Sequence, residues 1–556
     1  MSAKRRKSED QGLVFLPLGG TNEIGMNCYC YGVGPAEERS WLMVDLGVKF
    51  GGDAEPGVDV ILPDVGFITS NKRDLCGLVI THAHEDHIGA VPWLWPQLEC
   101  DVHCTPFAAE LLKLKLKEHG LDGEVPVIVH QPGKPFKAGP FTVEYVEVTH
   151  SIPQSHALYI KTEHGKVLHS GDWKIDRTPV LGKPFNEKRF IEIGKEGVDA
   201  FICDSTNVLR EGNSISESEV SSTLAEIIRH APGRVAVTTF ASHVERIASA
   251  VRAARANGRE VVIAGRAMRN TIEAARICGL IENTGAFLDE GEFGYLPPDK
   301  IMLLCTGSQG EPRAAIARIA EDNHPNIALE KGDLVIFSAR TIPGNEKEVG
   351  SVVNNLARLD VDVITGEDVP SIHSSGHPRQ GELEQMYGWV KPKALIPMHG
   401  EARHLRAHAK FGSEKGIAQT LVVADGQVAR LAPGPAALID EAPSGVLHVD
   451  GNLIVPGVDG PAKQRRKLSF VGMVIATVLV DDRLDLADDV SIILDGVPEG
   501  LSDELMVAAE KAYTSLPKPR RKDTPTVEET VRLSIRRAAE AQWGKKPVVK
   551  VIVVRV

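Results

Sequence analysis

The first part of the chain, from about Leu13 to Asp199, repeats short apolar runs separated by glycine, proline and aspartate. Apolar or alternating runs bounded by such turn residues are typical of β-strands. The strands predicted here are Val14–Leu18, Trp41–Val44, Leu78–Ile80, Phe141–Val148 and Lys166–His169, with a helix at Ala108–Glu118. This mixture predicts a strand-rich α/β layered domain.

In the next part, apolar runs alternate with amphipathic helical segments. The predicted strands are Val235–Thr238, Val261–Ala264, Met302–Cys305, Leu334–Phe337 and Val361–Ile364, and the helices include Val244–Ala256 and Arg313–Ala320. Strands that alternate with helices indicate βαβ units and a parallel sheet. A second domain is therefore expected over about residues 210–370.

A glycine- and proline-rich passage, Pro433–Lys467, is interpreted as a strand-containing linker, and it precedes a small α+β domain at the end of the chain. The strands predicted for this last domain are Phe470–Leu479, Val490–Leu494 and Pro547–Val556, and its helices are Asp503–Leu516 and Val527–Gln542. A chain of 556 residues has room for several domains of ~100–200 residues each.

Composition and charge narrow the class of protein. Hydrophobic residues make up 42% and charged residues 25%, as in ordinary globular proteins. The longest apolar run, Leu468–Val480, has 13 residues, whereas a bilayer span needs ~20, so no membrane span is expected. The charged N-terminus lacks a secretory pattern, which makes the cytoplasm the expected location. A net charge of −12 argues against nonspecific coating of nucleic acid but not against a nuclease, because bound cations supply local positive charge.

The eight cysteines form no CxxC pair. Cys100, His103 and Cys104 raise the alternative of a zinc clip, but a fourth ligand with matching spacing is missing. Buried or surface thiols are the preferred interpretation.

The most informative stretch is Leu78-Val-Ile-Thr-His82-Ala-His84-Glu-Asp86-His87, in which an apolar strand ends and three histidines and an aspartate follow within six residues. His82 and His84 are two apart in an extended segment, so they project to the same side and can share one metal ion. Asp86 and His87 lie on the following turn and can reach a second. Three more candidate ligands follow predicted strands, namely His150, Asp172 and His399.

This set of seven resembles the ligands of the metallo-β-lactamase superfamily, whose αββα fold places them on loops at one edge of its sheets. The resemblance implies one ion on His82, His84 and His150, a second on Asp86, His87 and His399, and Asp172 bridging the two. A water between two such ions becomes a hydroxide nucleophile at neutral pH. Zinc suits a histidine-rich shell, and manganese is the alternative because of the carboxylates.

A βαβ domain inserted before the last ligand is similar to the arrangement in β-CASP nucleases, whose further motifs match Asp204 in Cys203-Asp-Ser-Thr206 and His377 in Ser374-Ser-Gly-His377. Asp204 would orient a ligand histidine, or alternatively cap the following turn. His377 would contact the scissile phosphate or protonate the 3′ oxygen leaving group, unless the glycine turn gives it only a structural role. The implied catalytic residues are thus His377, Asp204 and Asp172.

With this resemblance the expected fold class is α/β, an αββα sandwich with an inserted parallel α/β domain and a small C-terminal α+β domain. The expected division is a disordered tail at 1–11, the metallo-β-lactamase domain at 12–209 and 371–440, the β-CASP domain at 210–370, a linker at 441–467 and the C-terminal domain at 468–556.

The stretches Pro17–Gly25, Thr306–Glu311 and Ser338–Asn345 and the C-terminal domain further resemble the RNase J ribonucleases. Both inner loops also suit phosphate binding, since each follows an apolar strand and leads toward a helix. The resemblance implies 5′→3′ exonucleolysis of RNA with a 5′ monophosphate, endonuclease capability, and roles in mRNA turnover and ribosomal RNA maturation. It also implies homodimers or homotetramers and partners in an RNA-degrading complex.

The family's 5′-nucleotide pocket maps onto the loop at 373–377 and onto a second short segment of the inserted domain. The residues concerned are His373, Ser374, Ser375, Gly376, His377, Ser242 and His243. The loop departs from the family's pattern at Ser374, where alanine or valine is common, which puts the fine contacts of the pocket in doubt. A structural cation found in some relatives would lie at Asp45, Gly47 and Asp450.

Three alternatives stay open at this point. A small-molecule metallo-hydrolase would use the same ligands, although the inserted domain and His377 favour a phosphodiester polymer. A DNA-directed β-CASP nuclease differs only in substrate. An inactive scaffold is disfavoured, because all seven ligands are present.

Overall fold

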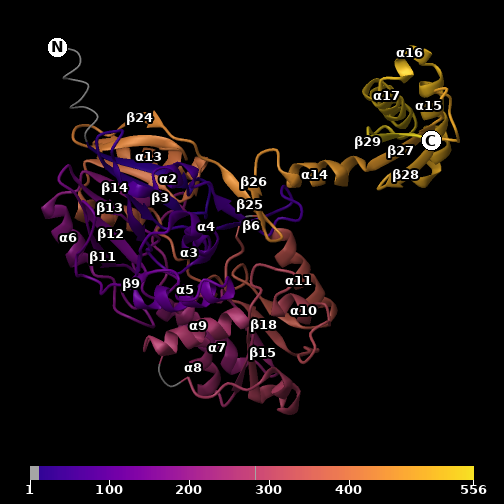
Figure 1. Cartoon of the computed structure of the whole chain (residues 1–556). Coiled ribbons are helices and arrows are strands. Elements are labelled where there is room, and N and C mark those ends of the chain that lie inside the picture. The colour runs from indigo at the N-terminus through magenta and orange to yellow at the C-terminus, as the bar shows by residue number, and fades with distance from the viewer. Residues whose placement is uncertain (1–11, 282–283, 343) are drawn as a thin grey trace, which may run out of the picture. The chain divides into compact units, whose positions relative to one another are not determined.

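The computed structural model describes residues 12–281, 284–342 and 344–556, so the disordered tail predicted at residues 1–11 lies outside the described residues. The chain divides into two compact units (Figure 1). One comprises the described residues up to Lys49 together with Leu62–Gly445, and the other comprises Phe50–Ile61 and Val446–Val556. The first unit contains both the predicted first domain and its insert.

Two sheets form the frame of the first unit. The eight-stranded sheet has the order β24 (Ala437–Glu441), β23 (Gln427–Ala432), β1 (Gly12–Gly19), β3 (Cys28–Gly34), β4 (Ser40–Val44), β7 (Leu75–Val79), β8 (Val102–Cys104), β9 (Val127–Val129). The seven-stranded sheet has the order β10 (Phe136–Ala138), β11 (Phe141–Glu147), β12 (His156–Lys161), β13 (Lys166–His169), β14 (Ala200–Asp204), β20 (Ala394–Met398), β22 (Gln419–Thr420). Each predicted strand of this region is present, with ends shifted by at most a few residues.

Alternate residues of the two sheets meet in one core, as the two-residue period of a strand requires. Phe15, Tyr31 and Val44 of the first sheet and Tyr145 and Ile202 of the second are all fully buried in it. The opposite faces carry helices. Trp41 of β4 meets Phe67 of α2 (Gly66–Ser70), and α6 (Glu187–Glu196) and α12 (Gln380–Val390) cover the second sheet. The result is the predicted αββα sandwich.

The remaining helices of this domain are α3 (Glu85–Ile88), α4 (Val91–Leu98), α5 (Pro106–Glu118) and α13 (Ala402–Glu414). The three strands β13, β14 and β20 are parallel neighbours in the second sheet. Their carboxyl ends therefore lie along one edge, where side chains of the following loops can converge.

The insert is a five-stranded parallel sheet, as the alternating pattern predicted. Its order is β16 (Glu260–Ala264), β17 (Ile301–Cys305), β15 (Val235–Thr238), β18 (Leu334–Phe337), β19 (Asp362–Ile364). Its helices are α7 (Glu217–His230), α8 (Val244–Ala256), α9 (Arg266–Ile277), α10 (Ala315–Ala320) and α11 (Glu346–Arg358).

The second unit ends in the predicted α+β domain, a three-stranded sheet with two long helices. The sheet has the order β28 (Ser491–Asp495), β27 (Met473–Val480), β29 (Val548–Arg555), and the helices are α15 (Ser502–Thr514), α16 (Lys518–Arg521) and α17 (Thr524–Trp543). In the part of the chain that the structure describes, no helix is long and apolar enough to cross a membrane.

One prediction for this region was wrong. The strand expected from Phe470 begins at Met473, because helix α14 (Pro461–Val471) has proline in its first turn and ends at Gly472, which has a φ of +62°. The segment predicted as a strand-containing linker does contain strands, β25 (Val446–Asp450) and β26 (Leu453–Pro456). These join β6 (Val60–Pro63) and β5 (Lys49–Phe50) in a four-stranded sheet, a long-range pairing that local patterns do not reveal.

A buried carboxyl on α8 makes the stability of the insert depend on pH. Glu245 is 8% exposed and accepts one hydrogen bond, from the Leu181 N–H at 2.9 Å. Burial, and then the negative charge of Glu217, raise the pKa of Glu245 to about 7. Between its ordinary pKa and about 7 the folded chain therefore holds more protons than the unfolded chain, so stability falls as pH rises through this range.

We expect Glu245→Gln to remove this fall in stability with rising pH while keeping the hydrogen bond from the Leu181 N–H. The variant should be more stable than the native chain by on the order of 3 kcal/mol near pH 8 and by about 1 kcal/mol near pH 5. Midpoints of thermal unfolding at the two pH values measure the difference. An equal gain at both would contradict the assignment.

Candidate metal centre

The seven predicted metal ligands lie together at the edge where the strands of the two sheets end. Within the first sheet, β7 leads directly to His82 and His84, and α3 carries Asp86 and His87. In the second sheet, the remaining three ligands follow strands β11, β13 and β20, and these are His150, Asp172 and His399. Five of the seven are buried, and His84 and Asp86 are partly exposed.

The ligands divide into two groups whose donor atoms lie within 4.8 Å of one another. One group is His82, His84 and His150, and the other is Asp86, His87, Asp172 and His399. Asp172 lies between the groups. Its Oδ2 is 3.8 Å from His150 Nε2 and 3.2 Å from His87 Nε2, and its Oδ1 is 3.0 Å from His399 Nδ1.

The donor atoms face one another in a way that suits cations. The Nδ1 of His84 is 3.1 Å from both His82 Nε2 and His150 Nε2. Neutral imidazoles so placed satisfy one another poorly, whereas one bound cation accepts all three lone pairs. In the second group, Asp172 Oδ1 and His399 Nε2 are buried and form no hydrogen bond of normal geometry, although Asp172 Oδ1 lies 3.0 Å from His399 Nδ1 and His399 Nε2 lies 3.3 Å from Asp86 Oδ2. The residues present therefore fit a pair of divalent metal ions.

The titration of the second group reflects its mixed charges. Burial by itself raises the pKa of Asp172, but the positive charges of His399 and His87 outweigh it and hold that pKa well below its ordinary value. Burial likewise lowers the pKa of His399, but Asp172 and Asp86 outweigh it and raise the pKa to about 10. The carboxylates are thus ionised, as metal ligands must be.

A second layer of hydrogen bonds orients the ligand rings. The Nδ1 of His87 is 2.7 Å from Asp45 Oδ2, and Asp45 is fixed in turn by the N–H of Thr81, which donates to its Oδ1 at 2.7 Å. His150 Nδ1 donates to the Gly376 carbonyl at 2.7 Å. Such partners set which ring nitrogen faces the metal and raise its basicity.

This gives Asp45 a role other than the predicted structural cation. Gly47 lies so close to the ligand turn that a Cβ there would be 1.6 Å from the Asp86 carbonyl oxygen, which explains the glycine. Asp450 belongs to the other unit, where its Oδ2 forms an ion pair with Arg465 Nη2 at 2.8 Å. No cluster of histidine, cysteine or carboxylate ligands among the described residues includes Asp45 or Asp450. The predicted cation thus has no support.

His377 and Asp204 form a hydrogen-bonded pair beside the two ligand groups. His377 Nδ1 lies 2.8 Å from Asp204 Oδ2 and 3.9 Å from Asp172 Oδ2. Burial lowers the pKa of His377, but the charges of Asp204 and Asp172 outweigh it and raise that pKa above its ordinary value. Asp204 also accepts a hydrogen bond from the N–H of Thr206 at 2.9 Å. Asp204 therefore caps the following turn and contacts His377 at the same time.

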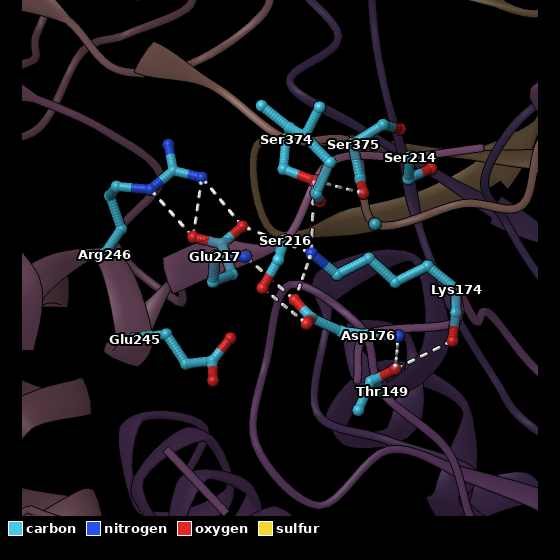
Figure 2. Close-up of polar contacts among 12 residues, drawn as sticks. Thr149, Lys174, Asp176, Ser214, Ser216, Glu217, Glu245, Arg246, Ser374 and Ser375 are labelled. Carbon is cyan, nitrogen blue, oxygen red and sulfur yellow. Dashed lines mark hydrogen bonds and ion pairs between the residues drawn. The ribbon is translucent and has the colours of Figure 1, made fainter. Parts of the chain in front are cut away.

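The residues predicted for a nucleotide pocket do not all face the same space. Ser375 accepts from Asn207 Nδ2 at 2.7 Å and His373 is half-buried, both on the loop that leads to His377. Ser242 is half-buried at the start of α8. In contrast, Ser374 and His243 are 2% and 1% exposed, and their polar atoms lie against charged side chains inside the domain (Figure 2 shows Ser374). A substrate contact by these two is therefore not supported.

The two loops predicted to suit phosphates lie side by side. Gln309 Nε2 donates to the Arg340 carbonyl at 3.0 Å, and its Oε1 accepts from the Ile342 N–H at 2.8 Å. The alternative of a zinc clip fails, since Cys100 and Cys104 are buried and belong to no ligand group among the described residues. His103 instead lies 2.9 Å from His130.

Comparison with family models matches most of the chain. The metallo-beta-lactamase superfamily matches residues 25–266, and the Ribonuclease J beta-CASP domain matches residues 232–356. The Zn-dependent metallo-hydrolase RNA specificity domain matches residues 366–422, and the Ribonuclease J C-terminal domain matches residues 462–556. These matches confirm the predicted fold class.

Relatives are similar over nearly the full length. The chain is 48% identical to Ribonuclease J of Sinorhizobium meliloti, covering 99% of this chain and 98% of that protein. It is 36% identical to Ribonuclease J of Corynebacterium glutamicum, covering 98% and 76%. A solved structure of a protein of unknown function from Enterococcus faecalis V583 shares the fold, with a TM-score of 0.51 at 15% identity, covering 77% of this chain and all of that one. The chain belongs to the Ribonuclease J family.

Proposed function

We propose that the chain is a metal-dependent ribonuclease that hydrolyses RNA phosphodiesters with two divalent metal ions. The observation that carries the proposal is the pair of adjoining ligand groups with His377 and Asp204 beside them. The relatives, named Ribonuclease J, support RNA as the substrate. Zinc is the first choice of metal because five of the seven ligands are imidazoles, and manganese is the second because the other two are carboxylates.

Bound ions at this centre would lower the pKa of a water and offset the charge of the phosphate oxygens. The residues of the chain then have distinct tasks. Asp172 spans the two ligand groups and fixes their spacing. Asp204 accepts from His377 Nδ1, which leaves Nε2 as the ring atom that donates a proton. We assign this proton to the 3′ oxygen that leaves when the phosphodiester is cleaved.

Three arginines near His377 favour a polyanionic substrate over a small ester. Arg379 lies two residues after His377, and the carbonyl of Arg210 accepts from the backbone N–H of Gln380 at 3.0 Å. Burial and the charges of Arg210 and Arg379 lower the pKa of Arg340, so the three positive charges are close together. Among the described residues, no carboxylate forms an ion pair with any of them. Such uncompensated charge suits the phosphates of a nucleic acid.

The finer assignments belong to the same proposal and rest on family likeness. They are 5′→3′ exonuclease action with a preference for 5′-monophosphate ends, endonuclease capability, and roles in mRNA turnover and ribosomal RNA maturation in the cytoplasm. We also propose a homodimer or homotetramer and association with an RNA-degrading complex. A DNA-directed nuclease is the second candidate, because the three arginines would contact DNA phosphates equally well.

RNA labelled at its 5′ or 3′ end, with a 5′ monophosphate or triphosphate, tests the proposal. We expect metal-dependent release of 5′ mononucleotides, faster from the monophosphate and abolished by EDTA. Asp172→Ala should lose most activity because the carboxylate that lies between the two ligand groups is removed. His377→Ala should keep its metal but slow cleavage by about 100-fold or more.

DNA of the same sequence is the matched substrate control. Cleavage of DNA but not RNA by metal-loaded protein would replace the proposal with its second candidate. Full turnover by Asp172→Ala that has been verified to hold metal would discard the role of that carboxylate.

The arginine cluster makes a separate prediction. Arg340→Gln should raise the KM for RNA about tenfold. It should also reduce the slope of log binding constant against log salt concentration by about the amount of one phosphate contact. Turnover of bis-p-nitrophenyl phosphate, which has no flanking phosphates, should be unchanged. Arg229→Gln, on the exposed face of α7, is the control and should affect neither. Equal losses on both substrates would show that Arg340 acts on the metal centre and not on the polymer.

A further inference from the structure

Four charged side chains are buried where the insert joins the first domain (Figure 2). Lys174, Asp176, Glu217 and Arg246 are each at most 1% exposed. Lys174 Nζ lies 3.3 Å from both Asp176 Oδ2 and Glu217 Oε1, and Arg246 Nη2 lies 2.9 Å from each oxygen of Glu217. We call these four residues the junction cluster. Its two cations and two anions balance, which is the condition under which buried charges persist.

The junction cluster ties both connections of the insert to the first domain. Glu217 is the first residue of α7, where the chain enters the insert, and its N–H donates to Asp176 Oδ2 at 2.8 Å. Arg246 donates to the Ile372 carbonyl at 3.3 Å, where the chain leaves the insert, and to the Ser338 carbonyl at 2.7 Å, directly after β18 within the insert. One set of ion pairs thus holds three segments that are far apart in the sequence.

The same cluster leads directly to two metal ligands. Lys174 and Asp176 lie on the loop after β13, two and four residues beyond Asp172. Lys174 also forms a β-bridge with Thr149, the residue before His150: its N–H donates to the Thr149 carbonyl at 2.8 Å, and Thr149 Oγ1 donates back to its carbonyl at 2.7 Å. The Asp176 N–H donates to Thr149 Oγ1 at 3.0 Å.

A second path reaches the His150 ring from the other side. Lys174 Nζ donates to Ser374 Oγ at 3.2 Å, and that hydroxyl donates to the Ile215 carbonyl at 2.6 Å. Two residues later, the Gly376 carbonyl accepts from His150 Nδ1 at 2.7 Å. A Cβ at Gly376 would lie 2.5 Å from the His150 ring, so the turn packs directly on it. His150 therefore has its backbone fixed through its neighbour Thr149 and its ring fixed by this turn.

We infer that Lys174 and Asp176 are positioning residues, which set the geometry of Asp172 and His150 and thereby the metal affinity of the centre. The inference rests on the proposed metal-dependent function. It makes the insert part of the frame of the metal centre, since Glu217 and Arg246 belong to the insert and Lys174 to the first domain. It also gives Ser374 and His243 a structural task, because His243 Nε2 lies 3.4 Å from Glu217 Oε1.

The test compares the single variants Lys174→Met and Asp176→Asn with the double variant that combines them. Each single variant leaves the buried charges unbalanced and is expected to lose thermal stability. The double variant removes one whole ion pair, so Glu217 and Arg246 remain paired and still balance, and most of the stability should return. This double variant separates a positioning role from mere support of the fold.

Metal affinity is measured with Co²⁺ alone, by titration of the visible absorption bands of the bound ion in the absence of RNA. We expect the double variant to unfold near the native temperature yet bind Co²⁺ about tenfold more weakly, with altered band intensities. The matched control, Lys113→Met with Glu110→Gln, removes an exposed pair on α5 and should leave the titration unchanged.

Native Co²⁺ affinity and spectrum in the stable double variant would overturn the inference. The readout involves no nucleic acid, so a failure of the ribonuclease proposal would leave this result intact. Conversely, a chain that cleaves RNA while the double variant binds Co²⁺ normally would refute only the positioning role.

Discussion

The central constraint on this protein is the crowding of seven imidazole and carboxylate side chains around one small space. Donor atoms of neighbouring ligands lie as close as 3.0 Å, and two of them, Asp172 Oδ1 and His399 Nε2, are buried without a hydrogen bond of normal geometry. Buried polar groups in this state are costly unless they are satisfied, and cations satisfy all of them together. The centre therefore depends on a scaffold that holds the ligands in place against their mutual repulsion.

The sandwich provides that scaffold through the ends of its strands. The three parallel strands β13, β14 and β20 deliver Asp172, Asp204 and His399 to one edge, and β7 delivers His82 and His84 from the facing sheet. Around them, Asp45 and the Gly376 carbonyl orient the rings of His87 and His150. The insert adds His377 at its return to the first domain, and the junction cluster fixes the place of that return. The contacts that dock the insert on the first domain therefore also position residues of the candidate metal centre.

Most of the fold and the ligand set could be predicted from the sequence because both depend on local signals. The spacing of His82, His84, Asp86 and His87 after an apolar strand is demanding, and strand ends point to His150, Asp172 and His399. The alternation of strands and helices likewise identified the parallel sheet of the insert. Each of these patterns is either contained in a short stretch of about a dozen residues or follows from the order of strands and helices along the chain.

Contacts between distant segments could not be predicted in the same way. Asp45 is 42 residues from His87, and Lys174 is 200 residues from Ser374, so nothing local shows that these pairs meet. The resemblance to relatives placed Asp45 at a structural cation and Ser374 in a nucleotide pocket, and the contacts that argue otherwise are visible only in the structure. The pairing of residues near position 60 with β25 was missed for the same reason. At Phe470, the proline and glycine that bound helix α14 outweighed the β-branched run that follows.

The number of metal ions per chain tests the central claim most directly. Native protein, His150→Ala and His399→Ala would be loaded with Zn²⁺, freed of excess metal and measured by elemental analysis. The account predicts two ions per native chain and one in each variant, because each substitution removes a ligand from one group and leaves the other group whole. A single ion in the native chain, or two ions in either variant, would contradict it.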